Sequence, residues 1–239
     1  MDIKLSIIFT VYNSHEAVRR QLIYFKSLNL PDDIEIIIMD DGSNPPLELP
    51  KDCPNNTFIF KTGIITPWSQ ALARNMSIEK ARGGMLLMTD IDHFFPIETI
   101  MAAKDFDGDK MMFKRQWGIL DKKGVFHQNK EILTKYGLSR RKRRKNFFTY
   151  CHHNSFAIKK SVYQALNGYK SRYWKNRFHR SGDSDFYKRY LKASLKGIFK
   201  PAVRDHLIYV FPAANANKLG LFHNLSRQDD PILEDKPCQ

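Results

Sequence analysis

The chain has 239 residues, of which 42% are hydrophobic and 13% aromatic, a composition that supports a full core and excludes a disordered protein. Its net charge of +14 favours an anionic partner, such as a nucleotide phosphate, nucleic acid, anionic lipid or acidic glycan. No stretch has the length and apolarity of a membrane span, and three widely spaced cysteines favour a reducing compartment. We therefore expect one cytoplasmic domain over residues 1–239, with peripheral attachment to the inner face of a membrane as an alternative.

The first half of the chain alternates apolar runs with one amphipathic segment. Residues 4–12 and 35–39 are rich in β-branched side chains, and residues 4–12 are apolar on both faces toward their centre, which is typical of buried strands of a parallel sheet. Residues 14–28 between them carry apolar side chains at helical spacing, and 40–46 form a strong turn signal. The β-α-β order predicts parallel pairing with a right-handed crossover.

A third strand is predicted over 57–61, a helix over 69–81, and another buried strand over 85–89. Together with the preceding elements they indicate an open α/β sheet, in which ligands bind beyond the carboxyl ends of the strands. Several polar side chains stand at those ends. They are Thr10, Tyr12, Asp41 and Asp92.

The strand over 85–89 runs directly into Asp90-Ile91-Asp92. Alternate residues of an extended chain point the same way, so both carboxylates can lie on one side. Two oxygen donors of this kind suit Mg²⁺ or Mn²⁺, and either ion suits a diphosphate. The simpler alternative is a strand followed by a polar turn.

The second half is less regular. We expect helices over 97–103, 161–166 and 183–196, and strands over 110–116, 124–127, 147–158 and 202–211. Six consecutive basic residues fill 140–145, and removing their six charges from +14 would leave +8. This basic run fits a solvated loop, with nuclear targeting, RNA contact and membrane-surface docking as alternatives.

Several motifs follow one another in a characteristic order. They are Ser-Ile-Ile-Phe-Thr-Val-Tyr-Asn at 6–13, Asp40-Asp41-Gly42-Ser43, Ala73-Arg74-Asn75, Thr89-Asp90-Ile91-Asp92, Asn167-Gly168-Tyr169 and Asp183-Ser184-Asp185-Phe186. In this order the chain resembles family 2 glycosyltransferases, which are inverting enzymes. The resemblance implies the α/β GT-A fold, a Rossmann-like open twisted sheet that is mostly parallel and flanked by helices.

The resemblance also implies a nucleotide site in the first half of the chain. Thr10, Tyr12 and Asp41 would hold the base and ribose of a sugar nucleotide, with uridine expected, and Arg74 and Asp90 would lie near the nucleotide. Without a nucleotide, Tyr12 would be a core aromatic and Asp41 a turn residue beside Gly42.

In such a site Asp90 and Asp92 would face a Mn²⁺ or Mg²⁺ ion bound to the diphosphate, with Asp92 as the direct ligand. GT-A enzymes often take a third ligand from a histidine in the C-terminal part, and His206 and His223 are both candidates here. His93 would form part of the pocket wall.

An inverting enzyme needs a base that deprotonates the acceptor hydroxyl. Asp183 matches the family's catalytic Asp, but Gly182 stands where the family usually has Glu, so Asp185 is a second candidate. The alternative role for both carboxylates is to cap a helix N-terminus. His153 and Asn154 fall where the family contacts the donor sugar or acceptor. 

An aromatic residue upstream of these carboxylates, Trp174, could stack on a sugar face. The expected protein is thus a metal-dependent inverting, hexosyl-type glycosyltransferase that moves a sugar from a nucleoside-diphosphate sugar, such as a UDP-sugar, to a glycan or lipid-linked acceptor. Polysaccharide biosynthesis would be a natural setting.

Residues of about 1–95 would form the nucleotide half, about 96–211 the acceptor half, and 212–239 a C-terminal tail. The alternatives are a nucleotidyltransferase, or a basic nucleic-acid-binding protein on a degenerate transferase fold, although no dedicated nucleic-acid partner is expected. Peripheral contact with an anionic membrane would use the basic run at 140–145.

Overall fold

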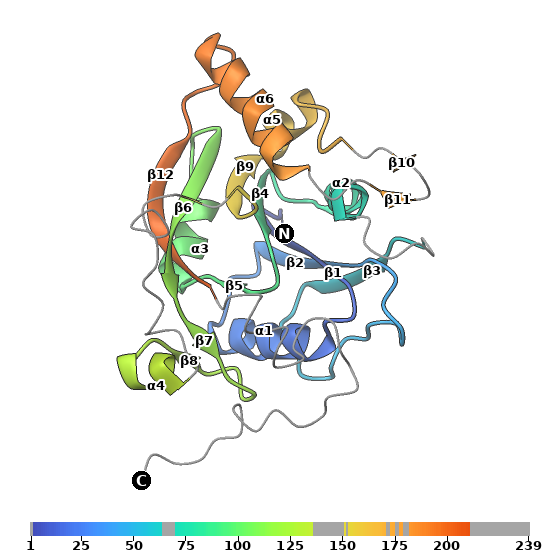
Figure 1. Cartoon of the computed structure of the whole chain (residues 1–239), viewed down its shortest axis with the longest axis vertical. Coiled ribbons are helices and arrows are strands. Elements are labelled where there is room, and N and C mark those ends of the chain that lie inside the picture. Colours follow the sequence, from blue (N-terminus) through green and yellow to red (C-terminus); the bar gives the residue numbers. More distant parts are fainter. Residues whose placement is uncertain are drawn as a thin grey trace.

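The computed structural model describes residues 2–63, 70–135, 151, 153–170, 173–174, 177–178 and 182–210. Within this part, eight strands form one sheet in the order β3-β2-β1-β4-β9-β6-β12-β5 (Figure 1). The strands are β1 (Leu5–Val11), β2 (Ile34–Asp40), β3 (Thr57–Lys61), β4 (Met85–Thr89), β5 (His93–Phe94), β6 (Lys110–Trp117), β9 (Phe156–Lys159) and β12 (Val203–Val210).

The half of the sheet built from the first 90 residues is entirely parallel. β1 pairs with β2 on one side and β4 on the other, and β3 extends the sheet beyond β2. Every residue of β2 and β4 is buried, because helices cover both faces. The predicted α/β class, with a parallel sheet covered by helices, is confirmed in this half of the sheet.

The other half of the sheet mixes strand directions. β9 runs antiparallel to both β4 and β6, whereas β6 and β12 are parallel to each other, and β5 pairs antiparallel with β12. β9 begins at Phe156, so the strand predicted over 147–158 is wrong for the described residues before it. Their polar side chains instead turn toward the carboxyl edge of the sheet, as shown below.

Each face of the sheet has its own core. On one face lie α1 (His15–Ser27) and α3 (Ile97–Lys104), and on the other lie α2 (Gln70–Lys80), α5 (Lys160–Ala165) and α6 (Asp183–Leu195). Tyr163 of α5 and Phe186 of α6 pack against each other with ring centroids 5.1 Å apart. In Figure 1, α1 lies apart from the α5–α6 pair.

The smaller elements are β7 (Ile119–Leu120), β8 (Phe126–His127), α4 (Lys130–Lys135), β10 (Tyr173–Trp174) and β11 (Arg177–Phe178). They form two short hairpins and one short helix, and only β8 was predicted, as a longer strand. Among the helices of the described ranges, none combines the length and apolarity that a membrane crossing requires.

Candidate active site

The carboxyl ends of β1 and β2 bring the predicted nucleotide residues to one edge of the sheet. Val11 pairs with Asp40 in register, and the Asp41 N–H donates a 2.8 Å hydrogen bond to the Val11 carbonyl. Asp41 is buried, and the Thr62 hydroxyl donates to its carboxylate over 3.3 Å. Parallel pairing therefore lines up Asp41 with Tyr12, which directly follows β1.

The two adjacent aspartates at the end of β2 differ in their surroundings. The Asp40 carboxylate accepts the backbone N–H groups of Ser43 and Leu47, each over 2.9 Å, and so shapes the turn after β2. Both carboxylate oxygens of Asp40 are thereby occupied by backbone hydrogen bonds. Asp41 is the member of the pair whose position at the carboxyl edge of the sheet matches the predicted binding of the nucleobase.

Three side chains gather where β4 ends. One ligand atom from each of Asp90, Asp92 and His93 lies within 4.8 Å of the others, and His93 Nε2 is 3.9 Å from Asp92 Oδ1. Two carboxylates and an imidazole suit Mn²⁺ well and leave room for phosphate oxygens. The donor set therefore fits the divalent ion that the sequence predicts, with His93 in the group rather than in the pocket wall alone.

Ser155 orients His93 within this metal group. Its buried hydroxyl forms a hydrogen bond with His93 Nδ1 and another, 3.0 Å long, with the Thr89 hydroxyl. Because Nδ1 is engaged by Ser155, Nε2 is the ring nitrogen that faces Asp92. A second layer of this kind commonly fixes metal-ligating histidines. Sequence reasoning missed Ser155, whose signal was a polar residue interrupting the apolar run before β9.

Burial perturbs the acidity of the metal group. Burial, followed by the neighbouring charge of Asp90, raises the pKa of Asp92 to about 8. Without a cation, this carboxyl group therefore binds a proton more readily than an exposed aspartate does. A divalent ion would displace that proton and restore the carboxylate.

Arg74 of α2 connects the metal group to Asp183, the predicted catalytic base. Its side chain is 2% exposed, and it donates to Asp90 Oδ1 over 2.7 Å and to Asp183 Oδ1. The guanidinium carbon also lies 5.1 Å from the centre of the Tyr169 ring. Arg74 was predicted to lie near the nucleotide, and its described partners are these carboxylates.

Asn75, the next residue of α2, explains two of the sequence motifs together. Its Oδ1 accepts the Tyr169 N–H over 2.9 Å and its Nδ2 donates to the Tyr169 carbonyl over 2.8 Å. Gly168 has a φ of +55°, and a Cβ there would lie 2.6 Å from Asn75 Oδ1. The Ala-Arg-Asn and Asn-Gly-Tyr motifs are therefore two sides of one contact.

The two candidate bases occupy different sides of the first turn of α6. Asp183 is largely buried against Arg74, next to the metal group. Asp185 instead pairs with Arg189 over 2.8 Å and Lys170 over 3.4 Å, and its side chain is 38% exposed. Burial would raise the pKa of Asp185, but the bonds to Arg189 and Lys170 outweigh it and lower the pKa.

The three residues predicted to contact the donor sugar or the acceptor lie in different surroundings. Asn154 Nδ2 donates to Asp90 Oδ2 over 2.7 Å, so Asn154 supports the metal group directly. His153 stacks on Tyr187 of α6 with centroids 4.2 Å apart. Trp174 lies in β10, where it pairs with Arg177 of β11.

Of the two predicted histidine ligands, His206 is absent from the metal group that the described residues form. His206 lies in β12 at a φ of +56°, within the irregular stretch between Arg204 and Leu207, and its N–H donates to Asp205. His223 and the basic run at 140–145 lie outside the described residues.

An open hollow lies along the second half of β6. Its volume is about 460 Å³, and its lining is Lys114, Arg115, Gln116, Trp117, Gln128, Leu133 and Leu207. The charge of Arg115 acts to lower the pKa of Asp92, so this side of the hollow is close to the metal group. The hollow thus offers cations, amides and an aromatic ring beside the acidic site.

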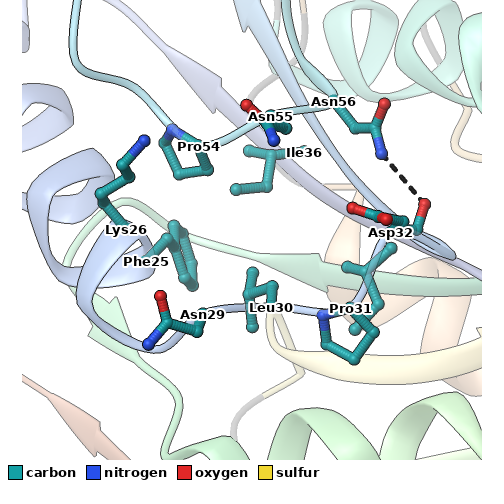
Figure 2. Close-up of a pocket in the computed structure, with 11 residues that line it drawn as sticks. Phe25, Lys26, Asn29, Leu30, Pro31, Asp32, Ile36, Pro54, Asn55 and Asn56 are labelled. Carbon is teal, nitrogen blue, oxygen red and sulfur yellow. Dashed lines mark hydrogen bonds between the residues drawn. The ribbon is translucent and has the colours of Figure 1, made fainter.

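A second pocket, of about 190 Å³, lies at the opposite edge of the sheet (Figure 2). Figure 2 shows Phe25 and Ile36 facing into it and Asn29 and Asn55 at its rim. It is formed by the end of α1 and the segments before β2 and β3, so it is separate from the candidate active site.

The sequence pattern of glycosyl transferase family 2 matches residues 6–166 of this chain. The match spans more than half of the chain and contains most of the site described above. The chain therefore belongs to glycosyl transferase family 2. A comparison with curated protein sequences found no match.

Two of the solved structures that share the fold of this chain confirm the predicted GT-A architecture. A mannosyltransferase, PcManGT from Pyrobaculum calidifontis in complex with GDP-Man and Mn²⁺, is 15% identical with a TM-score of 0.53, and the alignment covers 86% of this chain and 56% of that one. S. aureus TarS 1-349 in complex with UDP-GlcNAc is 15% identical with a TM-score of 0.55, covering 87% and 58%. This chain thus spans little more than half the length of either.

Proposed function

We propose that this chain is a metal-dependent inverting glycosyltransferase that moves a sugar from a UDP-sugar to a hydroxyl of a glycan or lipid-linked acceptor. One observation carries the proposal: Arg74 joins Asp90, a member of the metal group, to Asp183 at the start of α6. A metal-diphosphate site and a base are thereby held next to each other at the carboxyl edge, which is what direct transfer requires.

The nucleotide would lie over the ends of β1 and β2. Tyr12 offers an aromatic face to the base, and Asp41 can accept a hydrogen bond from the uracil imide. At the metal group, both Asp90 oxygens already accept bonds from Arg74 and Asn154, so Asp92 and His93 are the ligands favoured for direct coordination. The ion, Mn²⁺ or Mg²⁺, would neutralise the leaving diphosphate.

The acceptor would approach from the hollow along β6. Its hydroxyl oxygen forms a bond to the anomeric carbon while the bond from that carbon to the diphosphate oxygen breaks, and the hydroxyl proton passes to Asp183. Lys114 and Arg115 would suit an acceptor that carries phosphate, such as a lipid-linked sugar.

Two measurements test the proposal. The melting temperature should rise with UDP-sugars in the presence of Mn²⁺, more than with GDP- or dTDP-sugars, and with EDTA the rise should vanish. Transfer should then give a product with the anomeric configuration inverted. Tight RNA binding with a steep salt dependence, together with no stabilisation by any sugar nucleotide, would overturn it.

A further inference from the structure

A fully buried lysine lies beneath α6 and belongs to none of the sequence motifs of the candidate active site. Lys110, the first residue of β6, has no solvent exposure, and its Nζ has no hydrogen-bond partner among the described residues. Buried lysines are rare, and they usually pair with a carboxylate or a backbone carbonyl. This one therefore calls for a specific explanation.

Aromatic rings surround the ammonium group instead. Nζ lies 3.8 Å from the centre of the Phe156 ring and 5.1, 5.6 and 5.2 Å from those of Phe186, Tyr187 and Tyr190. Ring faces attract a cation electrostatically, and the attraction is strongest where water is excluded. The Lys110 cage thus holds a charge without any hydrogen bond.

The Lys110 cage lies on the same face of α6 as the proposed base. Asp183 precedes Phe186 and Tyr187 by three and four residues, and Tyr190 follows one turn later, so all lie along one stripe of the helix. The charge of Asp183 acts on Lys110 and favours its protonated form. The cation is therefore attracted both to the rings of α6 and to the carboxylate at its start.

We propose that Lys110 is a positioning residue for the transfer step, whose buried ammonium group fixes the first turns of α6 on the sheet and so sets where Asp183 meets the metal group. The inference rests on the proposed function of Asp183. Lys110 does not touch substrate. It acts through the helix that carries the base.

Packing alone does not require a charge at this position. An apolar side chain of similar length would fill the same space between Phe156 and the α6 rings, and replacing buried charges by apolar groups is often stabilising. A charge retained at a stability cost is typical of a functional constraint. The ammonium group attracts the Asp183 carboxylate electrostatically, which a methionine side chain cannot do.

The test compares Lys110→Met and Lys110→Arg with the wild-type chain. Lys110→Met keeps the length of the side chain and removes its charge, so we expect kcat at pH 7 to fall on the order of 100-fold, as for an ångström-scale misplacement of a catalytic group. The affinity for UDP without a metal ion should stay within about twofold, since the nucleotide edge is formed by other strands. Lys110→Arg keeps a cation over the rings at every working pH and should recover part of kcat.

The pH profile separates this role from simple packing. The groups around Lys110 that titrate or carry charge are Asp183, Tyr187 and Tyr190 of α6 and His153 before β9. Burial lowers the pKa of Lys110 to about 7, so wild-type kcat should decline above neutral pH as the ammonium group is lost. That decline should be absent in both variants, at a low kcat in Lys110→Met and at the partly recovered kcat in Lys110→Arg.

Lys104→Met is the matched control. Lys104 of α3 is also largely buried, but it forms a 3.3 Å ion pair with Asp33 at the opposite edge of the sheet. This variant should lose stability and keep kcat. A Lys110→Met protein with kcat within about twofold of wild type and an unchanged pH profile would overturn the inference alone. Wild-type protein without transfer or Mn²⁺-dependent UDP binding would overturn the proposed function as well.

Discussion

Replacing Lys110 by methionine should stabilise the folded chain. The pKa of Lys110 falls from its ordinary value of 10.5 to about 7, mainly because burial penalises the charged form. Each pKa unit corresponds to about 1.4 kcal/mol, so burying this charge costs about 5 kcal/mol at pH 6. A folded-state pKa already contains every interaction of the charge, including its attraction to the four rings, so Lys110→Met should raise the free energy of unfolding by up to about 5 kcal/mol.

The stability gained by Lys110→Met should decrease as the pH rises. Below pH 7 the lysine is charged in both the folded and the unfolded chain, so the full cost is present there. Between the folded pKa of about 7 and the unfolded value of 10.5, only the folded chain releases the proton, and the cost declines. The advantage of Lys110→Met should thus be largest at pH 6 and nearly absent close to pH 10.

Urea denaturation or thermal melting of both proteins at several pH values measures this difference. For a chain of this size, about 5 kcal/mol corresponds to roughly 10–20 °C in Tm at pH 6. Charges far from Lys110 titrate alike in both proteins and cancel, whereas the pKa of His153, which burial and then the Lys110 charge lower, should rise in Lys110→Met. A Lys110→Met variant that is less stable than wild type at pH 6, by an amount independent of pH, would refute this account of the buried charge.

The remaining predictions concern the metal group and the bases. Asp92→Asn should abolish Mn²⁺-dependent UDP binding without unfolding the chain, and unchanged affinity by calorimetry would contradict its role as ligand. Asp183→Asn should retain UDP binding and lose transfer by about 10²–10⁴-fold, while Asp185→Asn keeps transfer but loses up to about 1 kcal/mol of stability; the reverse pattern would move the base to Asp185. Ser155→Ala should weaken Mn²⁺ affinity about 10–100-fold by freeing the His93 ring, and equal affinity in both proteins would exclude His93 as a ligand.

The parallel half of the fold and the location of the site follow directly from local sequence. Residues 4–12 and 35–39 are apolar on both faces, and only a doubly covered strand accommodates such runs. Strand direction then determines where the polar ends meet, so Tyr12, Asp41 and Asp92 could be assigned to one edge. These inferences need no knowledge of distant contacts.

Contacts made across long stretches of chain could not be predicted in this way. Arg74 finds Asp183 across 109 residues, and Ser155 reaches His93 across 62. Lys110 fitted a strand pattern as its first residue, and nothing local indicates that three rings of α6 surround it. Such pairings depend on how α6 and β9 pack on the sheet, which periodicity does not encode.

The two carboxylates of the Asp-x-Asp motif, Asp90 and Asp92, have different surroundings. Asp90 accepts hydrogen bonds from Arg74 on one oxygen and Asn154 on the other, and both donors are fixed by packed elements. Asp92 has a raised pKa because its charge is buried beside Asp90, and a divalent ion would relieve that penalty. Since Arg74 also holds Asp183, a change at α6 can reach the metal group through a single side chain. Metal binding and base position should therefore be energetically coupled, with Arg74 as the link.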